Sequence, residues 1–95
     1  MKPVIANHPG YIGAFSRDEA EGAIPNGAVV RKRNSEKGDT RPNGDRGRVL
    51  GSIDMQALGM MDAERAGHRF MYFVEWDATP GCAVAVVDVK VGAEQ

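Results

Sequence analysis

Hydrophobic and polar residues alternate along several stretches of the chain, and such alternation predicts half-buried β-strands. The strongest is HRFMYFVEWD, residues 68–77, whose aromatic and β-branched residues suit a pleated surface. CAVAVVDVKV, residues 82–91, predicts one or two further strands, with a break near Asp88. The remaining two candidates are AVVRKR (residues 28–33) and RGRVLGSIDM (residues 46–55).

The alternation also assigns side chains to faces. In residues 46–55, it places Val49, Gly51, Ile53 and Met55 on one face, and Arg48, Leu50, Ser52 and Asp54 on the other. In residues 68–77, Phe70, Tyr72, Val74 and Trp76 share a face that is most simply a core stripe, while Met71 and Phe73 point the other way. Both faces of that strand are apolar. The second face therefore needs a cover, either the N-terminal segment with Tyr11, Ile12 and Phe15 or another subunit.

Between these strands the pattern predicts turns and one or two short helices. Ser16 and Glu19 match a capping box, which predicts a short helix ending at Gly22. IPNG, residues 24–27, is typical of a turn. QALGMMDAERAG, residues 56–67, favours a short helix or a single turn, with Asp62 as a candidate N-cap. Residues 1–10 contain two prolines and predict an irregular arm.

These elements predict a mainly β fold with one small antiparallel sheet that curls around its core. NGAVVRKR, GDRGRVLGSI, YFVEWD and PGCAVAVVDVKV together resemble the SH3-like small barrels in architecture. The resemblance covers residues 27–91 and implies binding of peptides, nucleic acids, ribosomal partners or sister subunits. The expected organisation is an N-terminal arm (1–26), a barrel (27–91) and a frayed tail (92–95).

Composition indicates the size, compartment and redox environment of the protein more clearly than its function. The chain has 95 residues, a formal net charge of -1 and a single cysteine, Cys82, which excludes an internal disulfide. No window approaches the length of a membrane helix, and the first residues lack a signal-peptide pattern. The expectation is one soluble cytoplasmic domain.

Positive charge concentrates around NSEKGDTRPNGDRGRVLG, residues 34–51. Residues 31–48 hold seven of the twelve Lys and Arg residues but only three acids, an excess of four positive charges. The glycine spacing matches neither a P-loop nor a dinucleotide fingerprint. The stretch therefore predicts a long, mobile, basic connection. It is either a solvated surface, a nucleic-acid surface or a site for an acidic protein partner.

No catalytic or metal constellation emerges from the spacing. His8 and His68 lie far apart, and Cys82 has no partner in a C-x-x-C arrangement. Glu75 and Asp77 are expected to pair across strands with Arg46 or Arg48. We therefore expect no cofactor, no metal and no enzymatic activity.

The leading hypothesis is a non-enzymatic interaction module that binds a protein partner through the basic segment and the nearby strand face. A nucleic-acid-binding barrel using the same cations is the alternative, and an accessory subunit of a larger complex is the second alternative. The sequence leaves the oligomeric state open. The candidate contact residues are Arg31, Arg33, Arg41, Arg46 and Arg48, with Tyr72 and Trp76 as conditional aromatic anchors.

Overall fold

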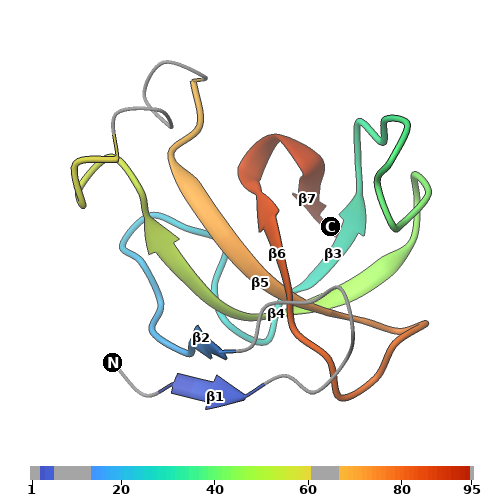
Figure 1. Ribbon diagram of the computed structural model, residues 1–95, viewed down its shortest axis with the longest axis horizontal. Helices are drawn as coiled ribbons and strands as arrows, with labels where there is room; N and C mark the ends of the chain where they lie inside the picture. The colour runs from blue at the N-terminus through green and yellow to red at the C-terminus, as the bar shows by residue number, and fades with distance from the viewer. Residues whose placement is uncertain (1–2, 6–13, 61–66, 95) are drawn as a thin grey trace.

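The computed structural model describes residues 3–5, 14–60 and 67–94. They form a five-stranded antiparallel sheet and a separate two-stranded ladder. The order in the large sheet is β6-β5-β4-β3-β7, and Figure 1 shows these strands as one strongly bent layer. Their bounds are β3 Val29–Lys32, β4 Arg46–Asp54, β5 Phe70–Trp76, β6 Val84–Val87 and β7 Val91–Ala93.

All four predicted strand stretches are confirmed. The expected break near Asp88 is a single 3-10 turn, η1, over Asp88–Lys90, which separates β6 from β7. Gly92 and Ala93 belong to β7, and the Glu94 amide donates to the Val29 carbonyl at 2.9 Å. The prediction of a frayed tail is therefore wrong as far as Glu94.

The sheet is mainly β and antiparallel as predicted, but it is open. β6 and β7 are its two edges, and no ladder joins them among the described residues. The predicted closed barrel is therefore not confirmed.

A β-bulge in β4 overturns part of the predicted face assignment. The register with β5 shifts between Val49 and Gly51, so the inward and outward positions exchange at that point. Val49 remains in the main core, whereas Leu50 and Ile53 pack together in a second cluster. Ser52, predicted to face away from Val49, is 1% exposed. An extra residue in one strand leaves no periodic signal in the sequence, which is why alternation misassigns Ile53.

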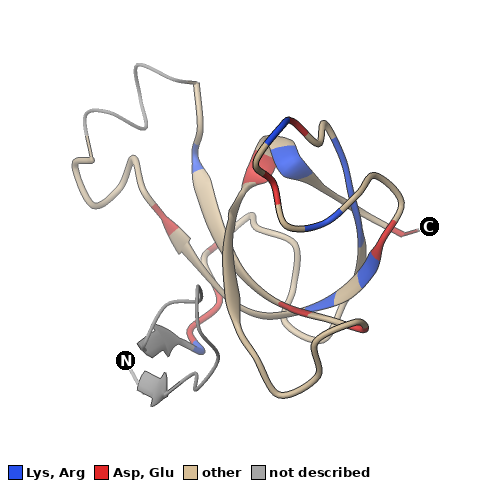
Figure 2. Cartoon of the chain, turned by 45° about the vertical axis from the view of Figure 1, so that its right-hand side comes forward, with Lys and Arg blue, Asp and Glu red and all other residues tan. Residues whose placement is uncertain are grey.

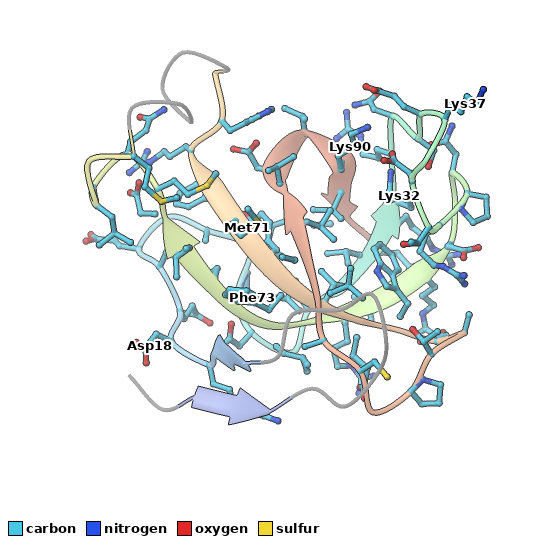
Figure 3. The ribbon with its side chains drawn as sticks, viewed as in Figure 1. Asp18, Lys32, Lys37, Met71, Phe73 and Lys90 are labelled. Carbon is cyan, nitrogen blue, oxygen red and sulfur yellow. The ribbon has the colours of Figure 1, made fainter. Side chains whose placement is uncertain are left out.

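Two hydrophobic clusters lie on opposite faces of β5. The main core contains Tyr72, Val74 and Trp76 and is completed by Val30, Val49, Val86 and Val91. The second cluster is centred on Phe73 and Ala83, which are 8% and 2% exposed. Phe73 is thus buried within the chain itself. Figure 3 labels it on β5. The side chains of Tyr11, Ile12 and Phe15, the predicted cover, lie outside the described residues.

The predicted helix beginning at Ser16 does not form. Residues 17–24 instead run along β4, where the Ser52 amide donates to the Asp18 carbonyl at 2.8 Å and Ser52 Oγ accepts from the Ala20 amide. Tyr72 Oη accepts from the Ile24 amide at 3.0 Å. These tertiary hydrogen bonds replace those of a helix of about one and a half turns, a length that is unstable on its own.

The remaining local expectations are partly met. The turn predicted over residues 24–27 lies one residue later, over residues 25–28, with the Ala28 amide donating to the Pro25 carbonyl. Residues 55–59 form turns rather than a helix, and Asp62 lies outside the described residues. The arm is not wholly irregular, because β1 (Pro3–Ile5) pairs antiparallel with β2 (Ala14–Ser16).

Candidate functional site

The segment between β3 and β4, residues 33–45, is called the long loop here. It is closed by hydrogen bonds between its ends: the Lys32 amide donates to the Asp45 carbonyl at 2.8 Å, and the Gly44 amide donates to the Lys32 carbonyl at 2.9 Å. Further in, the Ser35 amide donates to Asn43 Oδ1 at 2.8 Å. The long loop is therefore held as part of the fold, in contrast to the mobile connection that its composition predicts.

A buried lysine anchors the long loop from within. Lys32 is 6% exposed, and its ammonium group donates to the Arg33 carbonyl, to Ser35 Oγ and to Asp39 Oδ2 at 3.0–3.1 Å. These acceptors satisfy all three ammonium donors, so the buried charge is compensated. Lys32 therefore acts as a structural group of the loop.

Asp39 joins this anchor to the far end of the chain. Its Oδ2 also accepts from Lys90 Nζ at 2.9 Å and from the Glu36 amide at 2.9 Å. These hydrogen bonds, led by the one from Lys90, hold the pKa of Asp39 well below its usual range. Asp39 correspondingly raises the pKa of Lys90. Figure 3 shows Lys32 and Lys90 on the same side of the molecule as the long loop.

A cleft of about 240 Å³ lies between the long loop and β6. All four residues of β6 line it, although successive side chains of a strand point to opposite faces. We infer from this that the cleft follows the backbone of β6. Thr40 and Arg41 line it from the long loop, and Trp76 contributes from the core.

One polar group beside this cleft has no partner. Trp76 is 1% exposed, and no residue within the described chain accepts a hydrogen bond from its Nε1. A buried N–H without an acceptor carries a desolvation cost of about 1–3 kcal/mol. An acceptor supplied by a bound molecule would remove that cost.

The predicted arginines lie close together, but most are engaged by acids. Arg31 donates twice to Glu94 Oε1, at 2.6 and 3.0 Å, and Arg46 lies 3.8 Å from Asp77 and 4.0 Å from Glu94. The predicted pairing of Asp77 with Arg46 is thus confirmed. Arg31 also lowers the pKa of Glu94. Figure 2 shows blue and red segments close together on the side of the molecule near the C-terminus.

The other three predicted arginines differ from one another. Arg41 is half-buried, lies 3.4 Å from Asp45 and lines the cleft. Arg33 packs over the backbone of Gly92. Arg48 is exposed and stands opposite Glu75 in the register. Only Arg41 among the predicted cations therefore belongs to the cleft.

The two predicted aromatic anchors are core residues. Tyr72 and Trp76 are 3% and 1% exposed, so neither presents a ring face on the surface. Burial raises the pKa of the Tyr72 hydroxyl. The core-stripe interpretation of these aromatics is confirmed.

The described part of the chain offers few metal-binding or reactive side chains. No group of three His, Cys, Asp or Glu residues there is placed to hold a metal ion. His68 Nδ1 lies 3.5 Å from Asp88 Oδ1, and Cys82 is a half-buried free thiol. No described helix has the length and hydropathy required to cross a membrane.

Sequence reasoning missed Lys32, Asp39 and Lys90 as a unit. The signal for Lys32 was present, because alternation in VVRK places it on the inward face with the fully buried Val30. The choice of Asp39 as its partner, rather than Asp45, depends on the path of the long loop. That path has no sequence signature.

Comparisons with protein-family models, with curated proteins and with solved structures give no match. The cleft and the surfaces around it are therefore interpreted from their own geometry.

Proposed function

We propose that the protein is a non-enzymatic interaction module that binds an extended segment of a protein partner along β6. The observation that carries this proposal is the cleft beside β6, a sheet edge with no further strand partner among the described residues, with Trp76, whose buried N–H has no acceptor there, among the lining residues. An extended peptide that pairs with an edge gains affinity from main-chain hydrogen bonds and specificity from alternate side chains.

The edge itself supports strand addition. Apart from its ladder with β5, β6 makes no backbone hydrogen bond to another described segment. Its sequence, VAVV, contains no charge and no proline, the usual devices that protect an edge from pairing. By contrast, β7 is three residues long and Arg33 packs against it.

The size of the cleft favours a peptide over a free small molecule. Its volume of about 240 Å³ lies below the range of about 300–1,000 Å³ typical of small-molecule sites. It suits one or two side chains of a bound strand. We retain the resemblance to SH3-like barrels as part of this proposal, because the long loop after β3 and the pairing of β4 with β5 support it. A peptide strand added at β6 would extend the open sheet by one strand.

The nucleic-acid alternative receives less support from the same geometry. Arg31, Arg41 and Arg46 each lie beside a carboxylate, which weakens the field that phosphate binding requires. The accessory-subunit alternative rested on an uncovered second face, and Phe73 on that face is already buried.

The first prediction tests strand addition directly. Peptides of about ten residues are selected from a random library against the protein, and amide hydrogen exchange is then measured with and without a selected peptide. We expect exchange to slow at those amides of Val84–Val87 that point away from β5, because they would donate new main-chain hydrogen bonds to the peptide. Trp76 Nε1–H is expected to shift in the same spectra.

A blocking variant supplies the control. Thr40→Trp places a bulky side chain at an exposed, cleft-lining position, and Lys37→Trp places the same side chain on the long loop outside the cleft. Binding should be lost in the first variant and retained in the second. Equal binding by both variants, or unchanged exchange in β6, would overturn the proposal.

A further inference from the structure

A second concave surface lies on the other side of the molecule from the long loop. This groove has a volume of about 660 Å³ and shares no lining residue with the cleft beside β6. The chain that follows β2 forms one wall, through residues 18–22, and the turn after β4 forms the other. Figure 3 places Asp18 at this end, opposite Lys32, Lys37 and Lys90.

The groove is negatively charged. Among the described residues, its lining contains the carboxylates of Asp18, Glu19, Glu21 and Asp54 and one cation, Arg69. The guanidinium of Arg69 lies 3.2 Å from Asp54 Oδ2, so it is already engaged by one of the four acids. A backbone hydrogen bond from Ala57, together with Arg69, lowers the pKa of Asp54. The groove therefore presents negative charge at neutral pH.

The same groove carries apolar surface that the fold leaves exposed. Leu58, on the rim, is 67% exposed, and Met60 two residues later is 44% exposed. Ile53 and Ala57 also line the groove. An exposed large aliphatic side chain next to the apolar part of a concave surface is typical of a protein–protein interaction site.

We propose that this groove binds a basic protein segment that carries a large aliphatic residue. The charge of the lining selects Lys and Arg in the partner, and Leu58 and Ile53 provide the apolar contact. A small molecule fits less well, because ligand pockets bury about 70–90% of the ligand, whereas Leu58 on the rim of this groove is 67% exposed. The same acids repel nucleic acid.

This inference is independent of strand addition at β6. It gives the module two interaction surfaces of different chemistry, a neutral strand edge and an acidic groove. The paired charges of Arg31, Arg46, Asp77 and Glu94 are among the lining residues of neither surface.

The test uses a fluorescein-labelled peptide of about ten residues in which lysine alternates with leucine, a length that spans a groove of this kind. Anisotropy is measured with the full chain at about 50 and 150 mM salt. We expect saturable binding that weakens at the higher salt. A peptide with glutamate in place of lysine should not bind, and equal binding by it would overturn the proposal.

Two variants with the same change in net charge separate the groove from long-range attraction. Glu21→Lys reverses an exposed carboxylate in the groove, and Asp77→Lys reverses one outside it that is 64% exposed. Glu21→Lys should weaken binding by about tenfold or more, and Asp77→Lys by less than about threefold. Equal weakening by both would overturn the assignment to the groove.

The apolar contact is tested in the same way. Leu58→Ser removes the exposed side chain in the groove, and Val89→Ser removes one that is 43% exposed elsewhere. Neither position is in the core, so both variants should fold. Loss of binding is expected only for Leu58→Ser, and unchanged binding by that variant would contradict the apolar contact.

Discussion

Gly47 is a position where no side chain fits. A Cβ atom there would lie 2.7 Å from Trp76 Cε3, 2.7 Å from Val74 Cγ1 and 3.0 Å from the Glu75 carbonyl oxygen. These atoms belong to the buried core and to the neighbouring strand, so they cannot move aside freely. We predict that Gly47→Ala lowers the free energy of unfolding by about 1–3 kcal/mol, the cost of overpacking a core. Urea denaturation measures this loss.

Gly92 provides the matched control at the same scale. A Cβ atom at Gly92 would also lie 2.7 Å from another atom, but that atom is Cδ of the exposed Arg33 side chain. A flexible side chain can rotate away, so Gly92→Ala should change the free energy of unfolding by less than about 0.5 kcal/mol. Equal losses in both variants would show that the distance alone, and not the rigidity of the neighbour, sets the cost.

At the scale of elements, the long loop depends on the ionisation of Asp39. The folded-state pKa of this carboxyl is depressed by Lys90, the Glu36 amide and Lys32, so its stabilising contribution is fully present above its unfolded pKa of about 3.9. We predict that Asp39→Asn is less stable than the natural chain at pH 7. The difference should shrink progressively as the pH falls below about 4, because the carboxyl then takes up a proton in the unfolded chain while it stays ionised in the folded one.

Asp77→Asn is the control for this pH dependence. Asp77 pairs with Arg46 at 3.8 Å, and both side chains are about half exposed or more. An exposed pair of this kind contributes about 0–1 kcal/mol. Urea denaturation between about pH 7 and pH 3 should therefore show a pH-dependent difference for Asp39→Asn and almost none for Asp77→Asn. A constant difference for Asp39→Asn across that range would contradict the role assigned to its charge.

The strands were predictable from sequence, and the long-range contacts were not. Alternation and β-propensity located the stretches that contain β3 to β7, because both are local patterns. The face assignment failed after Val49, because the bulge in β4 depends on the register with β5. The capping box at Ser16 was a valid local signal, but the amides of Ala20 and Ile24 instead donate to the hydroxyls of Ser52 and Tyr72, which lie more than thirty residues away.

For the candidate sites too, local composition was visible in the sequence and the long-range contacts were not. The basic segment was visible in composition, but the acids that engage it include Glu94 at the far end of the chain. The cleft requires β6 and the long loop to meet, and the acidic groove requires residues 18–22 to lie against the turn after β4. Neither juxtaposition has a motif, since both arise from the path of the bent sheet.

At the scale of the whole molecule, the chain before β3 is part of the fold. The Asp18 carbonyl and the Ala20 and Ile24 amides bond to the sheet, and Ala23 and Ile24 pack against the main core. We therefore predict different results from two truncations. Removal of residues 1–16 should leave a cooperative unfolding transition, whereas removal of residues 1–24 should lower the thermal midpoint much further and cause self-association.

The self-association follows from what the longer truncation exposes. Ser52 would lose its partner at the Asp18 carbonyl, so this part of β4 becomes an unpaired edge, and the hydroxyl of Tyr72 becomes an unpartnered buried acceptor. Thermal denaturation and light scattering as a function of concentration measure both effects. If the two truncations share one midpoint and both remain monomeric, residues 17–24 are dispensable, and the acidic groove would have no fixed wall on that side.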